Sequence, residues 1–356
     1  MVQGNWTRTR PDDHEVAEGA ALRRAALIIA AILLVLVLAG VTVWTAFALW
    51  YRLPAPQFIR GFVGGTFVVL GLATIIALFS RLRLAMLLAF ASAFIGVLVW
   101  WSTIEPAAQA DWAPGVARQV TGTLDGDMLT LTDVRSFAWR SETDFDEHWV
   151  TRTYDLGKLR TLDLFMSYWG GHAMAHVMMS FGFEDGRYLT WSVEVRRLRN
   201  GEFSPLADLF KHDPLVIVAS DEPDVIGVRS NFRGEDVQLY RLRATPEKAR
   251  QLLLEYVDDA NRLAETPQFY NSLTKNCAIT VVKLMRAVGN PVPFDWRLIV
   301  DGYLPEYAYA RSALDTRLPL SELRARAHIA RRAQEAGLTA DFSRAIRIGV
   351  PSPLEP

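Results

Sequence analysis

The chain has 356 residues but only one cysteine, Cys277, and only six histidines. A single cysteine cannot form an internal disulfide, so no covalent cross-link within the chain stabilises the fold. Lys and Arg number 38 against 39 Asp and Glu, which leaves a net charge of −1. This balance offers no basic surplus, so nucleic acid is not expected as a partner, and no acidic block forms a solvating tail. Internal repeats and low-complexity tracts are also missing from the sequence.

Apolar sequence, in contrast, is abundant near the N-terminus. Residues 25–50 contain no charged residue, and two further apolar runs cover residues 61–80 and 84–101. About 20 apolar residues are enough to cross a bilayer as a helix. A cleaved signal peptide is the alternative for the first run, but its apolar core is roughly twice the usual length. The sequence therefore predicts three transmembrane helices within residues 25–101.

Arginines are distributed unevenly around these three predicted helices, which predicts an orientation. Arginines on the side predicted to be cytoplasmic are Arg8, Arg10, Arg23, Arg24, Arg81 and Arg83, against Arg52 and Arg60 on the other side. By the positive-inside rule, residues 1–24 are cytoplasmic and everything after Trp101 is periplasmic, in a multi-pass protein of a bacterial inner membrane. The spacing of Gly61 and Gly65 is compatible with a helix contact or with chance.

The remainder of the chain predicts a linker at 102–117, a periplasmic domain at 118–312 and a helical C-terminal extension at 313–356. An Asp125-Gly126 turn between alternating residues predicts a β-hairpin. Further predicted strands are 175–183, 187–197, 214–220 and 237–243. Thr245 and Pro246 are suited to begin a helix, a second helix follows Cys277 until Gly289-Asn290-Pro291, and a third runs from Ser321 to Gly337. The expected fold is α+β, an antiparallel sheet packed by helices.

Cys277 lies where this pattern predicts the start of a helix. In an oxidising compartment an unpaired thiol is either buried and inert or kept for reactivity. Asn276 is suited to cap the helix, which makes Cys277 its first residue. The positive end of the helix dipole favours a thiolate there, and free backbone N–H groups can hold an oxyanion. This position favours a nucleophile, although a structural cysteine at a helix start is the alternative.

A nucleophilic cysteine usually needs a base. His176 lies inside an apolar strand, and Ser192 and Glu194 share one face of the next strand. His176 as the base and Glu194 as its orienting acid form one interpretation. In the alternative interpretation, His176 is hydrogen-bonded only to backbone, and Glu194 forms an ion pair with Arg196 or Arg197. The HAMAH segment of His172 and His176 lacks the glutamate of a metalloprotease helix, so neither a metal nor a cofactor is expected.

Three blocks carry a family resemblance: YWGGHAMAHVMMSFGFEDGRYLTWSVEVRR, VASDEPDVIGVRSNFRGEDVQLYRL and FYNSLTKNCAITVV. Their order resembles the permuted NlpC-type papain-like fold, which includes lecithin retinol acyltransferase and its relatives. More closely, residues 110–300 resemble the Lnb-type N-terminal periplasmic domain, a domain of unknown function that opens the Bacteroides-type lipoprotein N-acyltransferase. That family pairs a histidine before Ser-Phe-x-Phe with Ser-x-Glu-x-Arg and Thr-x-Asn-Cys-Thr-Thr.

The resemblance implies roles for particular residues. Cys277 takes the place of the nucleophile and His176 that of the base, while His172 matches no histidine of the family. Supporting or substrate-binding residues from the matched blocks are Asn276, Ser192, Arg196 and Tyr270. This chain departs from the family at Ala278 and Ile279, where the pattern has threonines.

We therefore expect a membrane-anchored cysteine acyltransferase with a thioester on Cys277. Membrane lipid is the expected partner, with a phospholipid as donor and a lipoprotein or another amine as acceptor. Two alternatives remain: a papain-like peptidase or amidase acting on envelope peptides, and a non-catalytic membrane-anchored binding module. The sequence predicts no oligomeric state.

Overall fold

The computed structural model describes residues 13–289 and 291–353. The chain divides into two compact units, Met1–Ile104 and Glu105–Pro356, and each is described here by itself. Arg8 and Arg10, which contribute to the predicted orientation, and Asn290, which belongs to the predicted helix stop, lie outside the described residues.

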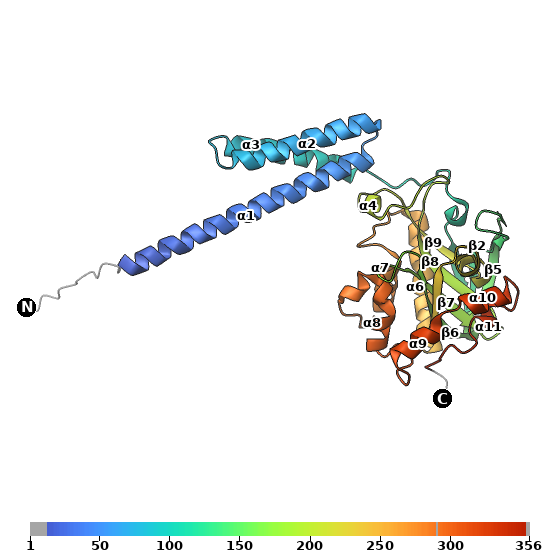
Figure 1. Ribbon diagram of the computed structural model, residues 1–356. Helices are drawn as coiled ribbons and strands as arrows, with labels where there is room; N and C mark the ends of the chain where they lie inside the picture. Colours follow the sequence, from blue (N-terminus) through green and yellow to red (C-terminus); the bar gives the residue numbers. More distant parts are fainter. Residues whose placement is uncertain (1–12, 290, 354–356) are drawn as a thin grey trace, which may run out of the picture. The chain divides into compact units, whose positions relative to one another are not determined.

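Three apolar helices form the first unit: α1 (Asp13–Arg52), α2 (Gln57–Ala77) and α3 (Arg83–Ser102) (Figure 1). The segments long and apolar enough to cross a membrane are Ala21–Arg52, Gln57–Ala77 and Arg83–Ser102. Many of their large apolar side chains are exposed, as expected for helices that face lipid. The prediction of three transmembrane helices is confirmed at the level of length and composition, and their orientation stays a prediction.

Small residues let α1 and α2 approach each other closely. A Cβ atom added to Gly71 would lie 2.2 Å from the Thr42 hydroxyl, and one on Gly64 would lie 3.4 Å from the Ala46 carbonyl oxygen. Gly65 has no atom within 4 Å of such a position. The closest approach therefore uses Gly64 and Gly71; of the Gly61–Gly65 pair, an added Cβ on Gly61 would lie 3.6 Å from the Trp50 ring of α1, so only Gly65 takes no part.

An eight-stranded sheet forms the centre of the second unit, in the order β1-β2-β9-β8-β7-β6-β10, with β5 also paired to β2. Its strands are β1 (Thr121–Asp125), β2 (Met128–Arg135), β5 (Trp149–Asp155), β6 (Leu159–Tyr168), β7 (His176–Phe183), β8 (Tyr188–Val195), β9 (Leu215–Ser220) and β10 (Asp236–Arg241). All pairings are antiparallel except that of β2 with β9. A separate hairpin joins β3 (Ala138–Trp139) to β4 (Phe145–Asp146).

Helices cover both faces of this sheet (Figure 1). The larger apolar core lies on the face covered by α6 (Pro246–Glu265), α7 (Cys277–Ala287) and α8 (Leu304–Ala310). A smaller core lies on the other face, beneath α5 (Glu222–Val225), α10 (Ala330–Ala336) and α11 (Phe342–Ala345). Short elements complete the unit: α4 (Pro205–Asp208), α9 (Leu320–Ala327) and a π-helical turn, Val228–Phe232. The predicted α+β fold with a mostly antiparallel sheet is confirmed.

Two local predictions are wrong in detail. The first hairpin turns at Gly126 and Asp127, because Asp125 pairs with Met128 and Gly126 takes the positive φ of +59°. The predicted helix 321–337 is broken into α9 and α10. At the break the Ile329 N–H donates to the Val237 carbonyl over 3.0 Å, so a contact with β10 replaces the helical hydrogen bonds.

Candidate active site

The sheet brings three predicted site residues together. His176 begins β7, and Met178, two residues further on, lies opposite Ser192 on β8. Because side chains alternate between the two faces of a strand, His176, Ser192 and Glu194 all lie on the same face of the sheet. The Ser192 hydroxyl oxygen lies 2.6 Å from His176 Nε2 and donates to Glu194 Oε1, also over 2.6 Å. His176 Nε2 is itself 3.1 Å from Glu194 Oε1. The hydroxyl and the carboxylate therefore fix the imidazole together.

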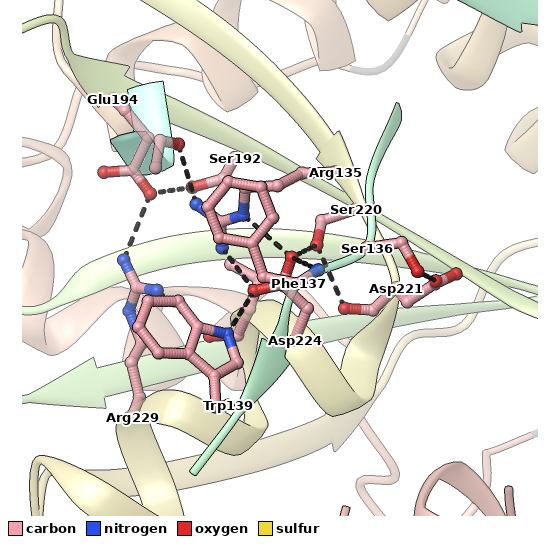
Figure 2. A network of polar contacts seen from close by, with 12 residues as sticks. Arg135, Ser136, Phe137, Trp139, Ser192, Glu194, Ser220, Asp221, Asp224 and Arg229 are labelled. Carbon is pink, nitrogen blue, oxygen red and sulfur yellow. Dashed lines mark hydrogen bonds and ion pairs between the residues drawn. The ribbon is translucent and has the colours of Figure 1, made fainter. Parts of the chain in front are cut away.

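An arginine that the sequence reasoning missed holds Glu194 from its other side. Arg229 donates to Glu194 Oε1 over 3.1 Å and to the Val225 carbonyl over 3.0 Å. Figure 2 shows Glu194 between Ser192 and Arg229. Arg229 lies in the π-helical turn Val228–Phe232, a rare conformation that often marks functional sites. No local pattern links it to Glu194, because the two are 35 residues apart.

Cys277 is the first residue of α7 and is buried, with only 4% of its surface exposed. The Asn276 side chain accepts a hydrogen bond from the Ile279 N–H over 2.8 Å and donates to the Ser272 carbonyl over 2.8 Å. The predicted cap is confirmed. Within the described residues, the N–H groups of Cys277 and Ala278 donate to no carbonyl or side chain. They are the free donors expected at a helix N-terminus.

The thiol and the imidazole meet at the end of the sheet. The Cys277 thiol interacts with the His176 side chain. Burial disfavours the charged imidazole, but the Glu194 carboxylate and the Cys277 thiol together raise the pKa of His176 to about 9. Burial would also raise the pKa of Glu194, yet His176 and Arg229 hold that pKa well below its ordinary value. At neutral pH the pair is therefore an imidazolium and a carboxylate.

Two buried tyrosines lie close to the thiol. Burial raises the pKa of Tyr256 and of Tyr270, and the negative charge of a Cys277 thiolate raises both further. Tyr256 also packs against Trp191, with ring centroids 5.4 Å apart. Tyr270, predicted from the sequence as a supporting residue, thus lies near the nucleophile, and both phenols stay neutral hydrogen-bond donors at ordinary pH.

An acid outside the predicted set borders the site from the segment after α7. Asp301 accepts a hydrogen bond from the Ala175 N–H over 3.0 Å. Burial raises its pKa, although Ala175 and His176 lower it in part. The next residue, Gly302, comes so close to the His172 carbonyl that an added Cβ would lie 2.1 Å from that oxygen. This segment fixes the backbone that leads into His176.

Two other predicted or considered residues lie apart from this cluster. Arg196 donates to the Val116 carbonyl over 3.3 Å and to the Ala117 carbonyl over 2.7 Å, and stacks on Trp112. It holds the segment before the sheet and does not pair with Glu194. His172 is about half exposed and stacks on Tyr168, with ring centroids 5.2 Å apart.

His172 and His176 form no metal-ligand group in the part of the chain that the structure describes. Asp208, His212 and Asp213 do bring their ligand atoms within 4.8 Å of one another. Both aspartates are buried, and burial together with Asp213 raises the pKa of Asp208 to about 7.

The fold and the site define a chain with three helices of membrane-spanning character and an α+β domain that brings a buried cysteine together with a partly buried histidine and glutamate. Residues 145–302 match the family model described as the Lnb N-terminal periplasmic domain, and the chain carries this domain. Comparison with curated proteins gave no match, and comparison with solved structures gave none either. The domain and the helices fit a membrane protein with a periplasmic domain.

Proposed function

We propose that this protein is a membrane-anchored periplasmic acyltransferase that carries its acyl group on Cys277. The observation that supports the proposal best is the interaction of His176 with the thiol of Cys277, the first residue of α7. A nucleophile, a base within reach and a third group that orients the base are the parts that covalent acyl transfer requires. The order of strand histidine, acid and helix-opening cysteine resembles that of a permuted papain-like thiol fold.

In the proposed resting state the thiol proton has already moved to His176, which is why that ring is an imidazolium, and the Cys277 thiolate attacks the ester carbonyl of a phospholipid. The carbonyl oxygen becomes an oxyanion, and the free N–H groups of Cys277 and Ala278 are placed to stabilise it. Collapse of the tetrahedral intermediate breaks the carbon–oxygen bond of the ester. The leaving alkoxide takes the proton from His176, which leaves a thioester on Cys277 and a lysophospholipid.

In the second half-reaction an amine attacks the thioester, and His176 accepts the proton that the amine loses. The carbon–sulfur bond breaks, the amide is released and the thiolate returns. Glu194 stabilises the imidazolium in both halves, and Ser192 fixes the ring orientation. Arg229 keeps Glu194 ionised, so that the acid supports the charge of the imidazolium without taking its proton.

The lipid class of the substrate rests on the three membrane-length helices and on the family resemblance. A lipoprotein amino terminus is the proposed acceptor. The peptidase or amidase hypothesis uses the same thiol chemistry with a peptide carbonyl in place of the ester, so the two hypotheses differ in the substrate and not in the site.

Incubation of the full chain with vesicles of acyl-labelled phospholipid tests the proposal. We expect a labelled, hydroxylamine-sensitive acyl group on the peptide that contains Cys277, with none in Cys277→Ala or His176→Gln. His172→Gln is the matched control and should retain the label. Peptide cleavage without an acyl-enzyme would contradict the proposal and support the peptidase hypothesis. An inert thiol would contradict both and support the hypothesis of a non-catalytic binding module.

A further inference from the structure

A mainly apolar cavity of about 370 Å³ lies beside α7 on the larger core. That volume falls within the range of small-molecule pockets, about 300–1,000 Å³. Its walls come from the sheet and from the helices around α7. Its apolar lining residues include Leu162, Met179, Val281, Met285, Leu298 and Leu304.

One stripe of α7 forms a long wall of this cavity. Val281, Met285 and Val288 line it, and Cys277 begins the same stripe four residues earlier. Cys277 itself does not line the cavity. The cavity therefore runs along the helix from one turn beyond the thiol to the C-terminal end of α7.

The cavity opens at the far end from the thiol. Val281 and the wall residues near it are buried. The exposed lining residues are Arg243, Thr245, Pro291, Arg311 and Ser312. Contacts hold this end together: Lys248 donates to the Val288 carbonyl over 2.6 Å, and Arg311 donates to the Pro291 carbonyl over 3.3 Å.

Positive charge surrounds the opening. Arg243 and Arg311 are exposed there, and Lys248 is half-buried between them and the helix end. In the described part of the chain the Arg243 side chain makes no hydrogen bond or ion pair, although it helps to lower the pKa of Asp315. Asp315 is already held by Arg317 through two contacts of 2.8 Å. A free guanidinium is thus available for an anion.

We propose that this cavity binds one single-chain anionic amphiphile, with its alkyl chain along the α7 stripe and its anionic group on Arg243 and Arg311. A fatty acid and an anionic lysophospholipid share this chemistry. The inference goes beyond the proposed function, because it rests on the cavity and its charged opening and not on thiol chemistry. The ligand would lie against the helix whose first residue is Cys277.

A palmitate analogue with a photoreactive diazirine near the chain end tests this in the full chain, reconstituted in nanodiscs of zwitterionic lipid. We expect cross-links on Val281, Met285 or Leu304, mapped by mass spectrometry. Excess palmitate should remove them and neutral hexadecanol should not. Competition by lysophosphatidylglycerol as strong as that by palmitate identifies the lysolipid as a ligand, and weaker competition identifies the free acid.

Charge reversal tests whether the arginines at the opening of the cavity contribute to binding. Arg243→Glu and Arg311→Glu together should lower the labelling at least about tenfold, since they remove the charge-assisted contacts to the anionic group. Arg331→Glu, on the exposed surface of α10, is the matched control. Cys277→Ala should keep the labelling, so failure of the proposed function leaves this test intact. Labelling outside the cavity, or labelling that hexadecanol removes equally and charge reversal leaves unchanged, would overturn the proposal.

Discussion

Figure 2 shows two ion-pair groups, one around Asp224 and one around Glu194, which differ in what their hydrogen bonds lead to. Asp224 accepts hydrogen bonds from the Arg135 guanidinium, the Phe137 N–H, the Trp139 indole and the Ser220 hydroxyl. Every partner of this carboxylate is a fixed protein donor, so the group is closed. Glu194 is also held by an arginine, but its group continues through His176 to the thiol of Cys277. The first group is built to hold the fold, and the second keeps a titratable ring beside a nucleophile.

The largest expected effect breaks the closed group. Asp224→Asn leaves the Arg135 guanidinium charged and buried without its partner. The side chain of Arg135 is 6% exposed and that of Asp224 is 1% exposed. Loss of one partner of a buried ion pair costs about 3–5 kcal/mol. Thermal unfolding of the full chain in detergent should show a fall in Tm of about 6–20 °C.

Asp144→Asn is the matched control, because Asp144 pairs with Arg140 on the surface. It should leave the Tm nearly unchanged, because an exposed ion pair is screened by solvent. Equal effects of the two substitutions would contradict the role given to the closed group.

The second effect concerns pH and belongs to the group of Glu194, His176 and Cys277. Because the pKa of His176 rises on folding from 6.5 to about 9, the folded protein binds this proton more tightly than the unfolded chain. The stabilisation is complete below pH 6.5 and declines as pH rises through about 9. The difference in unfolding free energy between wild type and His176→Gln should shrink by on the order of 2–3 kcal/mol over this interval.

Glu194→Gln sharpens the same measurement. Without the carboxylate charge the pKa of His176 falls, so the loss of stability should shift to lower pH. Equal pH profiles of the wild type and Glu194→Gln would show that Glu194 does not set the charge of His176.

The smallest effect tests whether Arg196 belongs to either group. Arg196→Ala removes hydrogen bonds to the Val116 and Ala117 carbonyls and should cost about 1–2 kcal/mol. It should leave the alkylation rate of Cys277 unchanged. A large fall in that rate would return Arg196 to the role that the family resemblance implies.

Local patterns predicted the parts of the site that depend on near neighbours. The cap of Asn276 on the Ile279 N–H needs only four consecutive residues, and period-two alternation was enough to place His176 and Glu194 on neighbouring strands. The helix 321–337 failed for the opposite reason, because a contact of Ile329 with Val237, far away in sequence, interrupts it.

Partners that only the tertiary fold brings together could not be predicted from the sequence. Arg229 reaches Glu194 from a π-helical turn, and Asp301 reaches Ala175 from beyond α7. No spacing rule connects such positions. Val281 and Met285 line the cavity from one face of α7, but side-chain periodicity cannot separate a filled core from the wall of a cavity.

The reaction of Cys277 with iodoacetamide at pH 7 tests the central claim most directly, because the chain has no other thiol. The rate should fall at least about tenfold in His176→Gln, since a paired imidazole is what maintains the thiolate. His172→Gln, an identical substitution of a histidine outside the cluster, should react like the wild type. Equal rates in wild type and His176→Gln would contradict the account, because Cys277 would then be a buried cysteine with no catalytic partner.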